Sequence, residues 1–382
     1  MNNTLFPETE QNNVVHFPTA YEQILERINN VNPLQYSKTR NFLNGAVTYL
    51  SPYISRGIIS VKQVMESVFE KGYKPYQIEK FLQELAWREY FQRVWQSMGN
   101  GIWNDIKQPQ PNVQHHDMIK TVDNAATGIE AIDEQIRQLQ HIGYMHNHVR
   151  MYTASMVCNM AKAHWQQPAK WMYYHLLDGD IASNNCSWQW VSGAFSSKKY
   201  YFNQDNVNKY SFSQQRQSFL DKTYEELTAM SVPEVLKATT NLSFKTTLPD
   251  TPFPIIDTGK ATLIYNSYNL DANWRKEEDL NRILLLEPSH FSANPVSEKV
   301  IQFITDLSKN IEGIQVYTGE MKDIVKPYQN TQLQNSCIIS KEHPSFTHYP
   351  GTKDSREWMF PEVTGYYNSF FSFWKKCEKY LK

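Results

Sequence analysis

One short stretch of the chain concentrates side chains that can do chemistry. LLDGDIASNNCSWQW, at positions 176–190, has two acids around a glycine, two adjacent asparagines and two tryptophans one residue apart: Asp178, Asp180, Asn184, Asn185, Trp188 and Trp190. Carboxylates and amides bind polar groups of a ligand, and indoles stack on flat ones. The stretch is too polar for a plain core segment and too aromatic for a plain loop, so it is the first candidate for a site.

Three further stretches carry polar residues in suggestive patterns. In VTYLSPYISRG the hydroxyls of Thr48 and Ser51, with the backbone N–H groups of a turn, can surround a phosphate. Two predicted helices each place three such side chains on one face: Glu84, Trp87 and Arg88 in FLQELAWREYF, and Asn147, Arg150 and Met151 in GYMHNHVRM. Taken singly, each pattern is typical of a capped helix start or a solvated helix side.

The elements that must position these residues show two sequence patterns, one helical and one with short strands. Helical periodicity runs from about residue 17 to 235, and predicts helices at 21–28, after a Ser60–Gln63 capping box, at 76–98, at 129–142, at 145–165 and at 168–177. Residues 236–256, with three prolines, are predicted to be a linker. Beyond it ATLIYNSY, RILLLEP, IQVYT and SCIIS indicate buried strands, with a helix at 296–311, and favour a small, mostly parallel α/β domain.

Composition excludes several classes of protein. The 382 residues carry 38 basic and 39 acidic side chains, so bulk charge favours neither nucleic acid nor a membrane surface, although a local basic groove stays open. The four scattered cysteines, without a CxxC pair, predict reduced thiols and no metal site. No apolar run reaches membrane-span length, and residues 1–16 are expected to be a disordered leader. These features favour a cytoplasmic monomer. The sequence contains no glycine-rich nucleotide-binding loop, no HExxH motif of zinc peptidases and no GxSxG nucleophile elbow.

Together and in this order, the stretches resemble the FAD-binding helical domain of the DNA photolyase and cryptochrome family. The resemblance begins at FPTAYEQILERI and ends near YFNQDNVNKYS, and its most specific part is the DGDxAxNNxxWQW pattern at 178–190. It implies an α+β multidomain protein: an all-α FAD-binding domain at 17–235, the linker at 236–256, and a small Rossmann-like α/β domain at 257–382 that ends in an aromatic helix. The family normally places its α/β antenna domain first, so the arrangement here would be permuted, or the N-terminal antenna domain missing.

The resemblance also implies a role for each cluster. The cofactor-binding set is Tyr36, Thr48, Ser51, Arg88, Arg150, Asp178, Asp180 and Asn184. Within it, Arg150 and Asp178 pair beside the flavin ring, and Asn184 faces flavin N5. An amide at that place favours the reduced or neutral radical flavin. The bound cofactor would be FAD, active when reduced. Whether a second, antenna chromophore accompanies it stays open.

On the substrate side the resemblance is to the branch that repairs cyclobutane pyrimidine dimers, since the (6-4) branch carries histidines where this chain has Asn147 and Met151. The implied substrate-binding set is Glu84, Trp87, Asn147, Met151 and Trp190, and the implied catalytic set is Glu84, Asn184, Trp188 and Trp165. The dimer leaves the base stack, excited reduced flavin gives it an electron, and the electron returns after the ring splits. UV-damaged DNA would be the partner. The alternative is a cryptochrome-like light sensor without repair.

Several positions depart from the family pattern. Trp188 and Trp165 match the inner two of three tryptophans that carry electrons to the flavin, but the third falls in QPQPNVQHHDMIK, at 108–120, which has none; Trp103 or a tyrosine is the candidate substitute. His148 stands at a family arginine position, and Phe81 and Tyr144 stand where the family has tryptophan. The candidate side chains for contacts to DNA phosphates are those of Arg56, Lys198 and Lys199.

Overall fold

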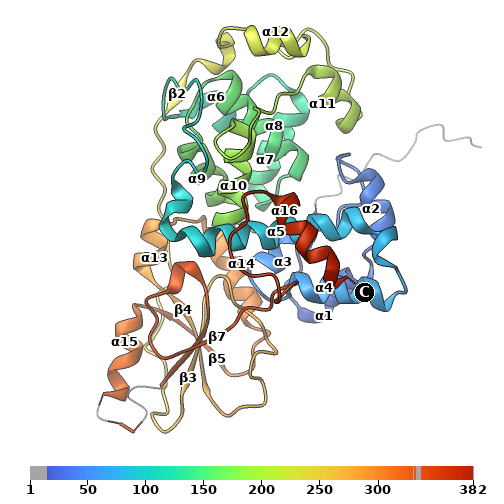
Figure 1. Ribbon diagram of the computed structural model, residues 1–382. Coiled ribbons are helices and arrows are strands. Elements are labelled where there is room, and N and C mark those ends of the chain that lie inside the picture. Colours follow the sequence, from blue (N-terminus) through green and yellow to red (C-terminus); the bar gives the residue numbers. More distant parts are fainter. Residues whose placement is uncertain (1–14, 330, 333–336, 382) are drawn as a thin grey trace, which may run out of the picture.

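The computed structural model describes residues 15–329, 331–332 and 337–381, so most of the predicted leader lies outside the described residues. Its first part is a set of helices (Figure 1): α1 (Tyr21–Asn29), α2 (Pro33–Thr39), α3 (Ser51–Ser55), α4 (Val61–Glu70), α5 (Glu79–Met98), α6 (Lys120–Asp123), α7 (Glu130–Ile142), α8 (Asn147–Ser155), α9 (Gln166–His175), α10 (Ile181–Ser192), α11 (Gln204–Ser211) and α12 (Tyr224–Ala229). The long α5 crosses the centre of this part.

Two predicted helix ends are confirmed, one set by a capping side chain and the other by a glycine. Ser60 caps α4 by accepting the N–H of Gln63 at 3.0 Å. Gly143 ends α7 with φ 78°, and a Cβ there would lie 2.7 Å from Cγ of Leu177. The helix expected at 145–165 is shorter, because a buried π-helical turn at Met156–Met160 follows α8.

The second part is a five-stranded sheet whose strands are all parallel. It comprises β3 (Thr262–Tyr265), β4 (Asn281–Leu286), β5 (Ile314–Thr318), β6 (Ile338–Lys341) and β7 (Thr352–Asp354), in the order β5-β4-β3-β6-β7. The helices α13 (Pro288–Ala293), α14 (Glu298–Ser308) and α15 (Met321–Val325) connect its strands or follow them, and α16 (Phe370–Cys377) comes after β7 near the end of the chain. The predicted parallel α/β arrangement is therefore present, with β7 added. The strand order reverses between β3 and β6, which makes a topological switch point there.

Alternate residues of the central strands face two separate cores. Leu263 and Leu284 point to the side of α14 and join one core with the helical part, where the rings of Tyr53 and Phe303 lie 5.9 Å apart. Ile264 points to the opposite core, beneath α15. The sheet thus packs directly on the helices, and the chain returns to them at its end, where α16 lies along α5 (Figure 1).

The region expected to be a linker contains a short β-strand. Its early residues form β2 (Thr239–Thr240), which pairs antiparallel with β1 (Met118–Ile119) on the helical part. From 241 to 261 the described residues contain no helix or strand. The proposed domain boundaries stay a prediction. In the part of the chain that the structure describes, no helix combines the length and the apolar character that crossing a bilayer requires.

Buried histidines predict acid sensitivity. Burial lowers the pKa of His146, His175 and His290 to about 4 and holds that of His343 well below its usual value. The unfolded chain takes up these protons near pH 6.5. The folded chain takes them up only near pH 4 at His146, His175 and His290, and well below pH 6.5 at His343, so stability falls as pH drops below 6.5. Each group contributes about 1.4 kcal/mol per pH unit there.

We therefore expect the urea midpoint to drop steeply between pH 6.5 and 4.5 and to be nearly flat above pH 7. His290→Gln removes one of the four groups and should make the slope of unfolding free energy against pH shallower. An unchanged slope in this variant would contradict the assignment.

Candidate functional site

A half-buried ion pair joins α8 to the loop before α10. Arg150 Nη2 donates to both carboxylate oxygens of Asp178, at 3.1 and 2.9 Å, and Arg150 Nε donates to the carbonyl of Met145 at 2.9 Å. The side chains are 20% and 5% exposed. The pairing predicted for these two residues is present, and it places a fixed dipole where a polar ligand edge can bind.

Aromatic rings line the side of this ion pair. The guanidinium of Arg150 lies 5.5 Å from the ring centre of Tyr144, which meets Tyr49 edge-on at 5.3 Å and Phe17 at 5.4 Å. Burial raises the pKa of the Tyr144 phenol, which therefore stays neutral. Tyr49 has φ 54°, an uncommon conformation for a non-glycine residue, and sits between Thr48 and the start of α3. The loop thus brings an aromatic face, rather than only hydroxyls, to the site.

The other predicted phosphate-side residues lie on this loop and on α2. Tyr36 meets Phe81 edge-on at 5.2 Å, and burial raises its phenol pKa, with a further contribution from Glu84. The Thr48 hydroxyl accepts the N–H of Leu50 at 3.4 Å, and Ser51 is the first residue of α3. Both hydroxyl-bearing residues are half-buried.

Two polar residues of α10 face different partners. Asp180 caps the helix by accepting the Ser183 N–H at 2.7 Å, and it also receives Gln92 Nε2 at 2.6 Å and lies 3.7 Å from Arg88. Asn184 donates its Nδ2 to the carbonyl of Ala169 at 2.9 Å. This bond fixes the amide, so Oδ1 is left as the acceptor that a ligand N–H can use.

The predicted substrate-side residues are spread along the exposed edge of the same region. Glu84 pairs with Arg40 at 3.2 Å and with Lys80 at 3.6 Å. Trp87, three residues along α5, is stacked by Phe370 of α16, with ring centres 3.8 Å apart and planes at 10°. The remaining three are accessible: Asn147 is exposed, Met151 is half-buried and Trp190 is 38% exposed.

Arg56 is wrong as a DNA-phosphate contact. It is 1% exposed, and its guanidinium donates to the carbonyls of Leu177 and Ser267 between the helices and the sheet. Sequence position next to a motif cannot show that a charged side chain faces inward. Lys198 is exposed, whereas Lys199 donates to the carbonyl of Pro111, and burial lowers its pKa.

His148 also turns away from solvent. It is 8% exposed, its Nδ1 lies 2.9 Å from the carbonyl of Asn41, and burial lowers its pKa. A neutral, buried imidazole does not replace an arginine as a phosphate contact. His148 therefore offers no charged phosphate contact at this family arginine position.

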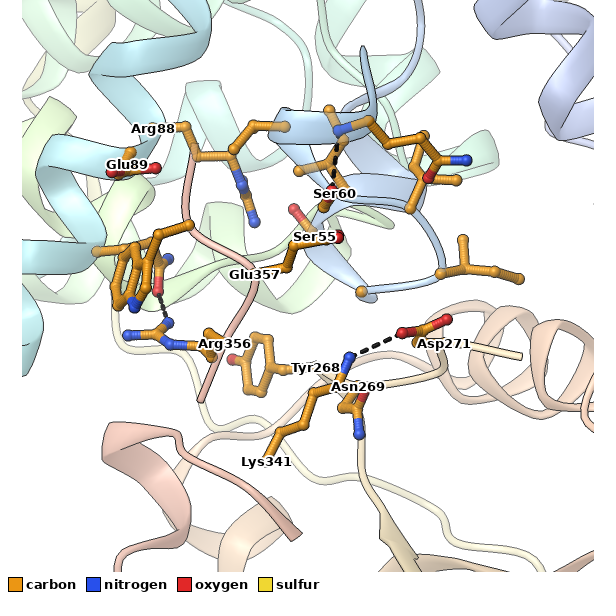
Figure 2. Close-up of a pocket in the computed structure, with 18 of the residues that line it drawn as sticks. Ser55, Ser60, Arg88, Glu89, Tyr268, Asn269, Asp271, Lys341, Arg356 and Glu357 are labelled. Carbon is orange, nitrogen blue, oxygen red and sulfur yellow. Dashed lines mark hydrogen bonds and ion pairs between the residues drawn. The ribbon is translucent and has the colours of Figure 1, made fainter. Parts of the chain in front are cut away.

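A cavity of about 300 Å³ opens between the helices and the sheet, beside Asp180. Figure 2 shows Arg88 and Ser55 on its upper side and Tyr268 and Lys341 on its lower side. The sheet residues follow β3 and β6, at the carboxyl ends of the strands that flank the switch point, which is where open parallel sheets usually bind ligands. Of the predicted site residues, Arg88 and Asp180 line it, whereas no sequence pattern indicated its sheet side.

Sequence reasoning missed several residues that complete these arrangements. They are Arg40, which pairs with Glu84; Gln92, which bonds Asp180; Tyr49, which meets Tyr144; and Arg356, which donates to Gln92 Oε1 at 2.6 Å. Gln92 could have been identified from the sequence, because it lies one turn from Arg88 on the same face of α5. Arg356 was not, because it comes from a segment remote in sequence.

These features define a helical domain that carries a half-buried ion pair, aromatic rings beside it and an oriented amide. Residues 81–265 match the family model described as the FAD binding domain of DNA photolyase. Over these residues the chain is similar to DNA photolyases.

Individual relatives cover only part of the chain. The deoxyribodipyrimidine photo-lyase of Streptomyces griseus is 32% identical over 149 residues, which are 39% of this chain and 32% of that protein. The photo-lyase of the same name from Agrobacterium fabrum is 31% identical over 175 residues, 44% of this chain and 36% of that one. The chain therefore spans about a third of the length of these relatives. The cryptochrome structure of Synechocystis sp. PCC6803 aligns with a TM-score of 0.47 and 25% identity, over 52% of this chain and 44% of that one.

Proposed function

We propose that the chain binds FAD between α2, α5, α8 and α10 and uses it, when reduced and excited by blue light, to repair cyclobutane pyrimidine dimers in UV-damaged DNA. The observation that carries the proposal is the combination of the Arg150–Asp178 ion pair with the fixed amide of Asn184. A charged pair and an oriented acceptor suit the polar edge of a flavin ring, and Tyr144 supplies an aromatic wall.

The hydrogen-bonding groups of these residues suit a reduced flavin. The Nδ2 bond to Ala169 leaves Asn184 Oδ1 to accept an N–H, which is present on flavin N5 only in its reduced or neutral radical states. FAD, when bound, supplies the light-excited electron. Asp180 accepts from Gln92 and pairs with Arg88 at the flank of the site, next to the interdomain cavity.

On the substrate side, this chain's residues bind and orient the lesion. Trp190, 38% exposed, offers an indole face to a splayed base, and Trp87 offers the face that Phe370 does not cover. The Glu84 carboxylate, paired with Arg40, places a guanidinium within reach of negative charge that develops on a pyrimidine carbonyl. Arg40 thus acts beside Glu84 at the lesion.

The decisive experiment measures loss of thymine dimers from an oligonucleotide by chemically reduced, FAD-loaded protein, in blue light and in darkness. Light-dependent repair that is lost in Glu84→Ala supports the proposal. Absence of repair by a protein that holds a full complement of FAD would end it, and would favour the light-sensor alternative.

One observation favours that alternative specifically. Phe370 of α16 lies flat on Trp87, the residue proposed to stack on DNA, so a C-terminal element touches the site directly. In a sensor, a change in the cofactor would be passed to this element. We expect limited proteolysis around residues 363–370 to be faster in blue light than in darkness, if the sensor alternative holds.

Matched variants make this test specific. Phe370→Ala removes the stacked ring, so its cleavage in darkness should rise several-fold to the level of the illuminated wild type. Phe371→Ala, at a neighbouring side chain that is 68% exposed, should behave as the wild type. Equal cleavage of the wild type in light and darkness would contradict the sensor alternative.

We also propose that the interdomain cavity holds a second ligand, the place for an antenna chromophore. Among the described residues, both amide atoms of Asn269 and two N–H groups of Arg356 are buried without a hydrogen-bond partner, and such groups are normally satisfied. Tyr268 and Trp358 give the cavity aromatic walls. Denatured protein should release a chromophore besides FAD, and Tyr268→Ala should reduce its amount. Release of FAD alone would rule this out.

A further inference from the structure

The outer face of α16 carries three lysines and an exposed aromatic ring. Lys375 and Lys376 lie in the last turn of the helix and Lys379 in the 3-10 turn that follows, and all three are exposed. Phe371, 68% exposed, lies one turn before Lys375 on the same side. Within the part of the chain that the structure describes, none of these lysines forms an ion pair. Apart from Glu378 at its edge, the face is therefore a cationic surface without counter-charge.

The opposite face of α16 anchors the helix on α5, so the lysines have a defined place. Phe370 is buried and lies flat on Trp87 of α5, and the Tyr90 hydroxyl of α5 donates to the carbonyl of Tyr367, just before α16, at 3.0 Å. The two helices lie side by side (Figure 1). Since α5 also carries Glu84, this packing sets the cationic surface beside the proposed substrate side.

The proposed substrate side needs cations, because the phosphate backbone supplies most of the affinity of DNA for a protein. Of the three side chains predicted to contact phosphates, only Lys198 is exposed, and it lies on the loop after α10, the helix that carries Trp190. On the α5 side, Arg40 and Lys80 are both paired with Glu84. The lysines of α16 are therefore the positive charges next to α5 that a phosphate can use without breaking an ion pair.

The packing of α16 decides between two kinds of anionic partner. A basic helix with aromatic residues can bind an acidic membrane surface, but it does so by burying its apolar face in the lipid. Here the apolar face, with Phe370, Phe373 and Trp374, is already buried in the protein. A DNA backbone requires only exposed cations, and an exposed ring such as that of Phe371 can stack on an unpaired base. The arrangement therefore favours DNA.

We propose that the outer face of α16 binds the DNA backbone beside the lesion. Lys375, Lys376 and Lys379 contact phosphates, and Phe371 lies against an unstacked base. This inference rests on the proposed repair of DNA, to which it adds a contact surface remote in sequence from the other substrate-side residues. Because these groups contact the backbone and not the dimer, they contribute to DNA binding and leave the splitting of the bound dimer unchanged.

The test measures the affinity of FAD-loaded protein for an oligonucleotide with one thymine dimer at several salt concentrations. The α16 variant, Lys375→Gln/Lys376→Gln/Lys379→Gln, should bind about tenfold more weakly at low salt. Its slope of log affinity against log salt should be shallower by about 2–3, since each lost phosphate contact removes about 0.9. The matched control makes the same change of net charge at three exposed lysines of the sheet part and should bind as the wild type does: Lys276→Gln/Lys322→Gln/Lys353→Gln.

Repair kinetics separate this inference from the proposed repair. The chemically reduced α16 variant should need about tenfold more dimer DNA for half-maximal repair but should reach the wild-type maximal rate, and its urea midpoint should match that of the wild type. Equal salt slopes in the α16 variant and the control, or binding of the wild type to vesicles of acidic lipid but not to DNA, would overturn the inference. Lysine-dependent DNA binding by a protein that repairs no dimers would support the inference and refute only the proposed repair.

Discussion

Arg150→Ala is expected to cost the protein both its cofactor and a large part of its stability. The substitution leaves the Asp178 carboxylate, 5% exposed, without the guanidinium that donates to both its oxygens. Removing one partner of a mostly buried pair typically costs about 2–4 kcal/mol, because the remaining charge stays desolvated. We expect the FAD content after purification to fall below a tenth of the wild-type value and the urea midpoint to drop.

The control is an ion pair at the surface. Arg216 pairs with Asp205 at 2.6 Å, but the side chains are 61% and 70% exposed, and water screens such a pair. Arg216→Ala should leave FAD content and the urea midpoint unchanged. The double variant Arg150→Ala/Asp178→Ala removes the uncompensated charge and should regain stability without regaining FAD. Full FAD content in Arg150→Ala would refute the placement of the cofactor.

The second large effect is expected for Asn184→Ala in the light-driven reaction. The amide oxygen, fixed by the bond from Nδ2 to Ala169, is the acceptor assigned to the flavin N–H. Loss of one preorganised polar contact to a reacting group typically lowers turnover by about 10²-fold. We expect that loss in dimer repair by chemically reduced protein, together with faster reoxidation of the flavin by air.

Ser183→Ala is the adjacent control for this position. The Ser183 hydroxyl is buried without a hydrogen-bond partner among the described residues, while its backbone N–H, which caps α10 through Asp180, is retained. This variant should repair and reoxidise as the wild type does. Equal repair by Asn184→Ala and the wild type would show that the amide does not act on the flavin.

Local patterns predicted the elements well where the residues themselves set the boundary. Ser60 and Gly143 cap or end helices through contacts within a few residues, and Leu284 marks a strand buried on both faces, so sequence alone was enough. The π-turn at 156–160 and the strand β7 had no such signal. The residues TKD of β7 are polar and become a strand only because β6 offers its free edge.

For the site, the resemblance selected the residues, but their partners depend on contacts between remote segments. Arg150 and Asp178 were predicted to pair and do so. Arg56 looked equally suited to a phosphate, yet it is covered by the sheet, which sequence reading of the helical part could not place. The stacking of Phe370 on Trp87 joins positions far apart in the chain, and neither residue type indicates this contact.

The way the final segment closes on α5 has a consequence for folding. The Glu89 carboxylate accepts the backbone N–H groups of Met359 and Phe360, which lie 270 and 271 residues later in the chain. The Asn310 side chain accepts the backbone N–H of Tyr21 and donates to the carbonyl of Thr19, which lie 289 and 291 residues earlier. Contacts this distant along the chain must wait for both ends, which slows the search for the native state. They also couple the helices to the sheet. The two parts should therefore melt in a single calorimetric transition. In the helical part made alone, the Glu89 carboxylate should lose its two backbone donors and keep only Arg93.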